Sequence, residues 1–301
     1  MALKKARALY RGFCQKRSQR FNMTGLLYFL NVFCTSGQSV LSKQYSKRGG
    51  AIEFNFNKAI AGSSLFLILA LISGFSFHLP TLWFGIAYGV SLCVSMHAGF
   101  RALAIGPMAL SSIIASFSLV IPFLFGIIFW SEAVTVFKIV GIVLLLCSIA
   151  LINGKKESGF SVKWLVYVII VLFSNGICSV IQKTHQMYYP GLYQTEFIFF
   201  ANVLAILVWF AFANVNAKAP GLHAPKITAL GLLGGVFNCL ANYTVLYLSA
   251  GENASVLFPI VSIANIMAVW ALGAILFKER TRPLQTVGLI VGIVSVVLLK
   301  I

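Results

Sequence analysis

Residues 107–143 read PMALSSIIASFSLVIPFLFGIIFWSEAVTVFKIVGIV. Two apolar runs meet in this stretch at the polar pair Ser131-Glu132. The first covers 107–130, and the second begins at 136 and continues to 152. Each run is close to the roughly 20 residues that a helix needs to cross the hydrocarbon core of a bilayer. Neither run alternates apolar and polar residues as a barrel strand does, so the stretch predicts two membrane-spanning helices.

The rest of the chain has the same character. Hydrophobic residues make up 59% and charged residues 10% of the 301 residues, and the mean hydropathy is +0.93. A soluble protein carries about 25% charged residues, so too few charges are present to cover a surface that faces water. We therefore predict an all-α polytopic membrane protein, integral and multi-pass, with the plasma membrane as its expected location. A window of about 19 residues gives ten transmembrane helices, at 24–42, 55–74, 81–104, 107–130, 136–152, 163–182, 193–213, 226–248, 253–277 and 283–299.

The charged residues are strongly unbalanced. Lys and Arg number 23, and the six acidic residues are all glutamates, which gives a net charge of +17. The absence of aspartate excludes Asp-rich diphosphate sites and Walker-B carboxylates. The basic residues lie between apolar runs, so their expected partner is the anionic headgroup layer of the lipid bilayer and not nucleic acid. The six cysteines form no C-x-x-C pair, and we expect no metal, cofactor or disulfide framework.

The first 22 residues form a basic N-terminal tail, 1–22, with seven Lys and Arg residues. The apolar run that follows is too long for a signal-peptide core and has no small-residue cleavage site, so it is predicted to be a retained helix. Met23 is an alternative start. Counting Lys and Arg, with Lys58 left out as intramembrane, gives ten on the N-terminal side of the membrane and twelve on the other. A start at Met23 changes the count to three and twelve, which favours external termini.

Two segments, 24–152 and 163–300, carry the same features in the same order and are predicted to be repeats of five helices each. Because five is odd, the second repeat enters the membrane from the opposite side, which predicts two inverted five-helix repeats. Such halves can rock about a shared site, so the parity predicts a secondary transporter that works by alternating access. The matched features are Lys43 with Lys183, Glu53-Phe54 with Glu196-Phe197, Gly106 with Gly251, and Glu132 and Gly141 with Glu279 and Gly288.

These passages also resemble a known family. Each half is similar to one EamA unit of the drug/metabolite transporter superfamily, in which an apolar helix with an internal proline and a terminal Glu precedes a Gly-containing fifth helix. The resemblance covers 24–300 and implies a ten-helix exporter or exchanger of small organic solutes, hence efflux. It also implies cytoplasmic termini and a central cavity lined mainly by helices 1, 3, 4, 6, 8 and 9. Many members have an arginine in the second helix, where this chain has Lys58.

Ionisable residues inside the predicted spans are candidates for function, because each costs about 2.5–3.5 kcal/mol to insert at mid-helix. His97 is placed near the middle of the third helix, and Asn242 in the corresponding part of the eighth, so the two are expected to face one cavity. His97 is a candidate to bind substrate or carry a proton, or to hydrogen-bond a neighbouring helix. Lys58 is a candidate to pair with an anionic substrate group, or to snorkel to the headgroups.

Amides and tyrosines within the spans suggest a cavity of hydrogen-bonding groups. The alternative for each amide is a contact between helices, worth about 0.6 kcal/mol. The G-x-x-x-G spacings at 85–89, 231–235 and 288–292 are predicted to be close-packing faces instead of binding sites. The further candidates for substrate binding are Asn31, Gln38, Asn202, Asn238, Asn265, Tyr28, Tyr88 and Tyr243.

The predicted function is transport of a small-molecule metabolite or drug, and the chain is not expected to be an enzyme. Two alternatives are a flippase of the same fold for a lipid-linked substrate and an intramembrane lipid-modifying enzyme. The enzyme is disfavoured because the chain has no H-x-x-x-D, H-E-x-x-H or G-x-S-x-G motif. A homodimer is left open as the assembly state.

Overall fold

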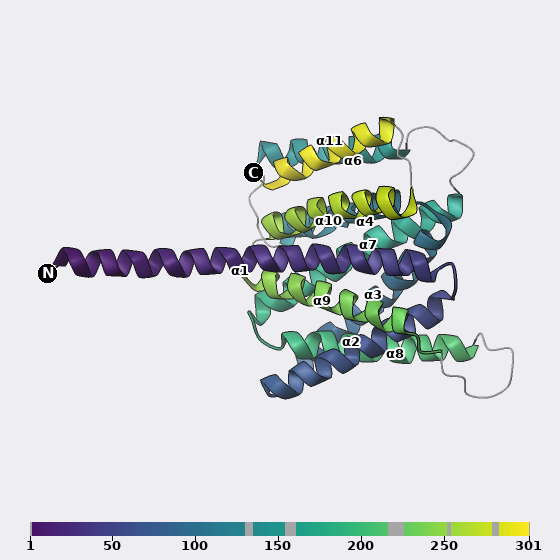
Figure 1. Ribbon diagram of the computed structural model, residues 1–301, viewed down its shortest axis with the longest axis horizontal. Helices are drawn as coiled ribbons and strands as arrows, with labels where there is room; N and C mark the ends of the chain where they lie inside the picture. Colours follow the sequence, from purple (N-terminus) through teal and green to yellow (C-terminus); the bar gives the residue numbers. More distant parts are fainter. Residues whose placement is uncertain are drawn as a thin grey trace.

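The computed structural model describes residues 2–129, 135–153, 161–215, 226–251, 254–278 and 283–300. These residues are helical apart from short connections, and no strand occurs among them. Figure 1 shows the helices stacked side by side as one bundle. In chain order they are α1 (Ala2–Tyr45), α2 (Ala51–Ser73), α3 (Leu79–Ile105), α4 (Met108–Ser116), the 3₁₀ turn η1 (Phe117–Leu119), α5 (Val120–Phe129), α6 (Val136–Asn153), α7 (Val162–Tyr188), α8 (Gln194–Val215), α9 (Ala229–Gly251), α10 (Ala254–Phe277) and α11 (Pro283–Lys300).

Five of the described helices are long and apolar enough to cross a membrane, namely α2, α3, α7, α8 and α9. Large apolar side chains also point outward, including Phe29, Ile72 and Ile128, which are 69%, 79% and 68% exposed. A soluble protein rarely exposes so many apolar side chains, whereas lipid tails cover them at no cost. The chain is therefore an all-helical integral membrane protein. The remaining predicted crossings fall on α1, α4 to α5, α6, α10 and α11.

The first helix is much longer than the predicted crossing at 24–42. It runs without a break over 44 residues, which corresponds to about 66 Å at 1.5 Å per residue. Figure 1 shows its N-terminal half projecting beyond the rest of the bundle. The predicted basic tail is thus helical from Ala2 onward and continues directly into the packed part of α1.

The predicted fourth crossing at 107–130 is not one regular helix. It consists of α4, η1 and α5, with the 3₁₀ turn at Phe117–Leu119. Pro122 explains the interruption, because it has no N–H for the carbonyl of Ser118 and its ring crowds that carbonyl. The chain tightens into a 3₁₀ turn directly before the proline, and the helix then resumes.

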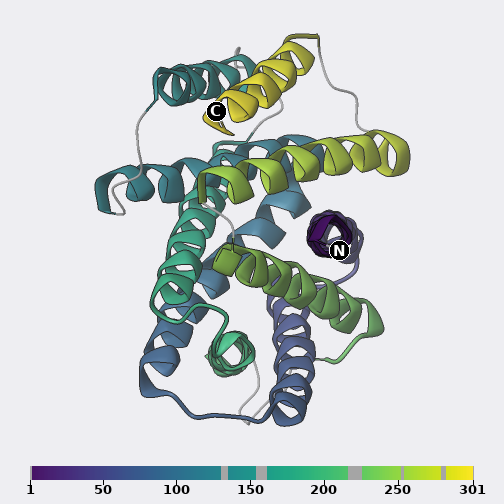
Figure 2. The same cartoon turned by 90° about the vertical axis from the view of Figure 1, so that its left-hand side faces the viewer.

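The packing of the helices has an internal correspondence. In the first set of contacts α1 packs against α9 and α10, and α2 packs against α9. In the second set α7 packs against α3, α4 and α5, and α8 packs against α3. Exchanging α1 for α7, α2 for α8, α3 for α9, and α4 with α5 for α10 turns the first set into the second. The end view in Figure 2 shows α1 lying beside α9 and α10, while α8 lies between α2 and α3.

The correspondence extends to single residues in two of the G-x-x-x-G segments. A Cβ atom added at Gly89 of α3 would lie 3.0 Å from the carbonyl oxygen of Ala201 in α8. A Cβ atom added at Gly235 of α9 would lie 2.7 Å from the Cα atom and carbonyl oxygen of Lys58 in α2. Each glycine thus lets two helix backbones approach closely, as the spacing predicted. Lys58 and Ala201 occupy corresponding places in the two contacts.

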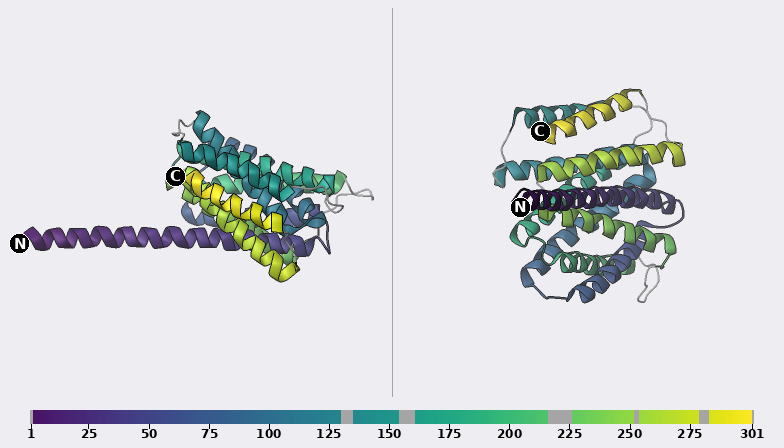
Figure 3. Two further views of the ribbon diagram at one scale, coloured as in Figure 1. Left: turned by 90° about the horizontal axis from the view of Figure 1, so that it is seen from above. Right: turned by 60° about the vertical axis from the view of Figure 1, so that its left-hand side comes forward.

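The third G-x-x-x-G segment lies in the pair formed by α6 and α11, at one end of the bundle (Figure 3). Ser148 Oγ of α6 donates a 2.6 Å hydrogen bond to the Gly288 carbonyl oxygen of α11. A Cβ atom added at Gly292 would lie 2.8 Å from the same Ser148 oxygen. This segment is therefore a packing face too.

Candidate functional site

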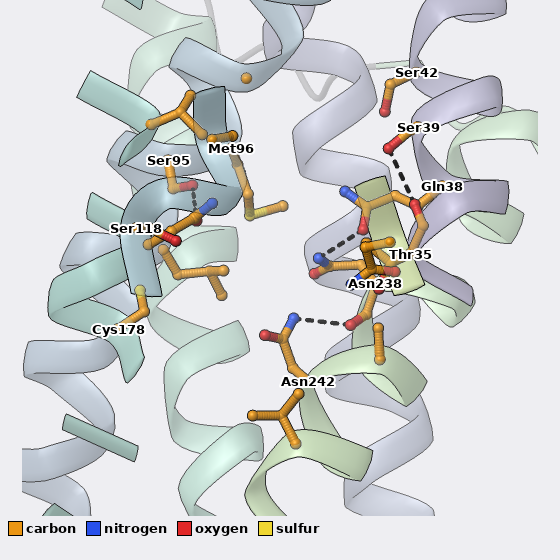
Figure 4. Close-up of a pocket in the computed structure, with 18 of the residues that line it drawn as sticks. Thr35, Gln38, Ser39, Ser42, Ser95, Met96, Ser118, Cys178, Asn238 and Asn242 are labelled. Carbon is orange, nitrogen blue, oxygen red and sulfur yellow. Dashed lines mark hydrogen bonds between the residues drawn. The ribbon is translucent and has the colours of Figure 1, made fainter. Parts of the chain in front are cut away.

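A cavity of about 300 Å³ lies inside the bundle. Its walls come from α1, α3, α4 with η1, α7, α9 and α10, which are the helices that the family resemblance implied, and α2 contributes as well. In Figure 4 Gln38 and Asn238 lie on one side of the open space, across from Ser95 and Met96. The cavity therefore has walls from both halves of the chain.

The two halves line the cavity with corresponding positions. With Lys43 aligned on Lys183, the lining residues of α1 fall on lining residues of α7. With Gly89 aligned on Gly235, the lining residues of α9 fall on lining residues of α3, which adds Phe100, Ala102 and Leu103 to the wall without such a counterpart. A sequence signal for this correspondence exists in α1, where the polar residues recur at helical spacing. The corresponding pairs are Asn31 with Val171, Thr35 with Asn175, Gln38 with Cys178, Ser39 with Ser179, Ser42 with Gln182, Leu92 with Asn238, Ser95 with Ala241, Met96 with Asn242, and Gly99 with Val245.

Hydrogen bonds connect four cavity helices. Asn238 Nδ2 donates to Gln38 Oε1 at 3.1 Å, and Asn242 Nδ2 donates to the Asn238 carbonyl at 2.8 Å (Figure 4). Behind them, Tyr88 OH donates to Asn242 Oδ1 at 2.7 Å, and Gln182 Nε2 donates to Tyr88 OH at 3.2 Å. The network runs from α1 through α9 and α3 to α7. It orients the amides of the cavity wall, and Tyr88 acts from outside the lining.

Asn31 has a structural contact on one side and an open acceptor on the other. Its Nδ2 donates to the Ala241 carbonyl at 2.8 Å and to Thr244 Oγ1 at 2.9 Å, which ties α1 to α9. Its Oδ1, like the Oδ1 of Asn265, is buried and has no hydrogen-bond partner among the described residues. Both residues line the cavity. Buried polar atoms normally have a partner, so these two oxygens are candidates to accept hydrogen bonds from a solute.

Lys58 lies in the cavity wall and is only 3% exposed. Its Nζ lies 5.8 Å from the centre of the Phe54 ring. Within the described residues it makes no hydrogen bond and no ion pair. A snorkelling lysine would extend its ammonium group to the headgroups, and a side chain enclosed by the bundle does not do so. The structure thus places Lys58 in the wall of the cavity, and its pairing with an anionic substrate group stays a prediction.

His97 does not line the described cavity. Its ring stacks on the ring of Trp209 in α8, with the centres 5.7 Å apart and an interplanar angle of 17°. The corresponding contact of the other half joins Tyr243 of α9 and Phe66 of α2, with centres 5.4 Å apart. Tyr243 likewise lies outside the lining. Both residues act in the packing of a helix against its neighbour.

Asn242 corresponds to Met96 in the structure, and not to His97 as the sequence predicted. The glycine contacts align Asn242 with Met96, and both of these residues line the cavity. A shift of one residue turns a side chain by about 100° around a helix, because a turn has 3.6 residues. That rotation carries His97 away from the cavity and toward α8.

Two further predicted residues lie outside the lining. Asn202 is buried, and it donates to the Ile198 carbonyl at 2.8 Å while Cys239 Sγ contacts its Oδ1 at 3.8 Å. This is the interhelical contact that the sequence left open as the alternative. The hydroxyl of Tyr28 is buried, and Tyr28 is not part of the described lining either.

Several polar residues that were not predicted from the sequence also line the cavity. Asn55 is the most informative, because neither of its amide atoms has a hydrogen-bond partner among the described residues. It lies one turn before Lys58 on α2, and that spacing could have identified it. The others are hydroxyl residues and one amide, namely Thr35, Ser39, Ser42, Ser95, Ser111, Ser118, Ser179, Gln182 and Ser262.

Two matched lysines bind helix ends near the cavity. Lys43, close to the end of α1, donates from Nζ to the carbonyl of Gly106 at the end of α3. Lys183, in the corresponding place on α7, donates from Nζ to the carbonyl of Ser249 in the last turn of α9, at 3.0 Å. Carbonyls at a helix C-terminus lack intrahelical partners and attract cations. Each half therefore has a lysine that ties its first helix to its third.

Comparison with known proteins agrees with this architecture. Residues 22–154 match the EamA-like transporter family. This segment belongs to that family. Among curated proteins no sequence matches the chain. Among solved structures that are similar to the chain, a crystal structure described as "Crystal structure of protein" superimposes with a TM-score of 0.65 at 12% identity. The match covers 92% of this chain and 96% of the other. Since the match to the solved structure includes both halves, the similarity of fold extends beyond the EamA segment.

For residues 22–154 the EamA match confirms the predicted family, which is part of the drug/metabolite transporter superfamily, whereas the predicted second unit lies outside the matched residues. It indicates a membrane transporter of small substrates, and EamA proteins are generally not enzymes. In the described part of the chain, no three His, Cys, Asp or Glu side chains come together as a metal site would require. The candidate site is thus the cavity with its amides, hydroxyls and single lysine.

Proposed function

We propose that the protein is a secondary transporter that moves a small organic solute across the membrane by alternating access. The single observation that carries this proposal is the lining of the cavity by corresponding positions of the two halves. A site built in this way keeps its wall when one half rocks against the other, so it can open to either side in turn. The amides and hydroxyls of the wall suit a polar metabolite or drug.

The proposal includes ten crossings arranged as two inverted repeats, 24–152 and 163–300. Its support is the exchange symmetry of the helix contacts, together with the odd number of predicted crossings in each half. An odd number requires the second half to enter the membrane from the opposite side. The plasma membrane, cytoplasmic termini and export of the solute belong to the same proposal, through the family resemblance.

The lipid-linked flippase is not favoured. Its substrate would need a continuous apolar path for acyl chains, whereas amides and hydroxyls lie on nearly every helix of this cavity. An intramembrane enzyme finds no support in the EamA match either. The proposed partners of the protein are accordingly a small-molecule substrate and the surrounding lipid.

The test of the inverted arrangement is accessibility labelling. Lys47→Cys and Tyr188→Cys introduce a thiol just after α1 and at the end of α7, where both native side chains are exposed. The background is a chain with its native cysteines replaced. A membrane-impermeant maleimide applied to one side of oriented vesicles should label only one of the two variants. Labelling of both from the same side would contradict the inverted repeats and, with them, alternating access.

Transport itself is measured in proteoliposomes. Vesicles loaded with a mixture of unlabelled amino acids, hydroxy acids and nucleosides should accumulate a radiolabelled member of that mixture by counterflow if the protein carries it. Empty liposomes and protein with Gly235→Leu, which blocks the contact of α9 with α2, are the controls. Absence of counterflow across the mixture, with a folded protein, would count against a carrier of small organic solutes.

A further inference from the structure

The cavity departs from its internal symmetry at α2. Asn55 and Lys58 of α2 line it, but the corresponding residues of α8 do not. The match of Phe54 with Phe197 aligns Asn55 with Ile198 and Lys58 with Ala201, and the two glycine contacts give the same alignment. Ile198 and Ala201 are apolar and are 1% and 0% exposed. A lysine and an amide are therefore present in one half where the other half has a packed apolar surface.

Lys58 carries the one formal charge among the described residues that line the cavity. None of these residues is Asp, Glu, Arg or His. Of the six glutamates, Glu53 and Glu196 bind elsewhere: Tyr45 OH donates to Glu53 at 3.3 Å, and the Ser76 amide donates to Glu196 at 3.2 Å. The other four, Glu132, Glu157, Glu252 and Glu279, lie outside the described residues. A buried ammonium group is costly without a counter-charge, and the described wall supplies none.

Asn55 gives a second and independent indication of a ligand. It is 0% exposed, and both its Nδ2 and its Oδ1 lack a hydrogen-bond partner among the described residues. A buried amide with four unused hydrogen-bonding positions is rare in a native protein. Asn55 and Lys58 are three residues apart on one helix and so share a face. Together they offer an ammonium group and an amide N–H to one small acceptor group.

Resting on the proposed transport function, we propose that the solute is a small monoanion, a monocarboxylate whose carboxylate group binds Lys58 Nζ and Asn55 Nδ2. One negative charge neutralises Lys58. A dianion would leave a second charge without a partner, and a zwitterionic amino acid would bring an ammonium group that no described carboxylate meets. A cavity of about 300 Å³ is at the lower end of the range for small-molecule sites, which limits the solute to a small metabolite.

The side chains of the remaining cavity walls indicate what the uncharged part of the solute is. Aliphatic side chains of α7 and α10, such as Val171 and Val261, alternate with Asn265 and with the amides of α9. The open acceptors on Asn31 and Asn265 suit a hydroxyl or amide hydrogen of the solute. A hydroxy-substituted or amide-substituted carboxylate with a short apolar segment therefore fits the cavity better than a fully apolar acid.

The test uses related molecules that differ in charge. Purified protein is melted with lactate, mandelate and pantothenate, with the corresponding primary amides, with the zwitterions alanine and phenylglycine, and with the dianion malate. A ligand that binds the native state raises Tm with concentration. We expect at least one monocarboxylate to raise Tm, and its amide to need roughly tenfold or more concentration, because hydrogen bonds to charged groups contribute about 1.5–3 kcal/mol.

The variants assign the effect to α2. Lys58→Met keeps the length of the side chain and removes its charge, so it should abolish the difference between acid and amide, while Lys58→Arg should retain that difference. Asn55→Leu should weaken carboxylate binding without removing the preference for the acid. Lys163→Met removes an exposed charge of α7 and should leave the response as in the wild type. Size-exclusion profiles and Tm without ligand establish that each variant is folded.

Three results would overturn the proposal: no shift of Tm with any of the monocarboxylates, equal shifts with acid and amide, or an unchanged preference for the acid in Lys58→Met. A shift with zwitterions alone is a case of the first result, yet counterflow of those zwitterions would leave the transporter function intact. Labelling of Lys47→Cys and Tyr188→Cys from the same face would contradict the proposed alternating access, but it would leave the binding of a carboxylate at Lys58 intact.

Discussion

The contact between Gly235 and the backbone of Lys58 sets the distance between α9 and α2, and it also holds in place the lysine of the cavity. A methyl group at residue 235 would lie 2.7 Å from the Lys58 backbone, and a backbone cannot move aside as the end of a side chain can. Crowding of this kind in a packed interior costs about 1–3 kcal/mol.

Gly235→Ala should therefore lower the Tm of the purified protein, whereas Gly25→Ala should not, because a Cβ atom at Gly25 of α1 meets no atom within 4 Å. Both variants add the same methyl group to a helix, which makes Gly25→Ala the control for helix propensity. Equal Tm values for the two variants would show that α2 and α9 are not in close contact.

His97 is the residue for which sequence and structure disagree most. As an intramembrane histidine it was a candidate for substrate binding or proton transfer, but its ring stacks on Trp209 outside the cavity lining. His97→Phe retains an aromatic ring for that stacking and removes both ring nitrogens. We expect its rate of solute flux in proteoliposomes to stay within about twofold of the wild type, since stacking is worth about 0.5–1.5 kcal/mol and is kept. A loss of flux together with a loss of its pH dependence would restore His97 as a proton carrier.

At the scale of elements, Lys43 and Lys183 make the same connection in the two halves, each to the end of its third helix. In the proposed inverted arrangement these two ends face opposite sides of the membrane. If each lysine closes the cavity on its own side, the two substitutions Lys43→Met and Lys183→Met should have opposite consequences.

The native thiol of Cys178 reports on this, because it lies in the cavity wall. In a chain where Cys178 is the one cysteine, Lys43→Met should increase its labelling from one face of the vesicle and Lys183→Met from the other. An increase from the same face in both variants would mean that the lysines stabilise the helix ends without gating the cavity.

The sequence predicted the elements well where a simple physical signal existed. Nine of the ten predicted crossings coincide with one continuous helix each, because length and hydropathy determine a crossing. The tenth, 107–130, contains Pro122, which breaks it into α4, η1 and α5. Site residues were harder to predict. Lys58 was identified because a charge inside a span is costly. The direction in which Asn55 and His97 point depends on their angular position around the helix axis, which changes by about 100° from one residue to the next. Apolar periodicity alone does not determine that position.

At the scale of the whole molecule, the N-terminal part of α1 extends beyond the bundle (Figure 1). A chain that starts at Met23 should accordingly fold and bind ligand with the Tm of the full chain, because the deleted residues leave the packed core intact. Fluorescence-detected size exclusion and a melting curve measure this directly. A marked fall in Tm would place residues 2–22 against the bundle or against a second copy of the chain.

Lys58 is present in one half of the chain, and the corresponding residue of the other half is the uncharged Ala201. This difference has an electrical consequence. When a monoanion is bound, the moving part that contains α2 is neutral, and its passage between the two open states transfers no net charge. When the cavity is empty, the same movement displaces one positive charge through part of the membrane field, whose full value is about 2.3 kcal/mol per 100 mV. The rate of exchange of one anion for another would then not depend on the membrane potential. The rate at which the empty carrier returns would depend on it, so the membrane potential of the cell would favour one direction of net transport.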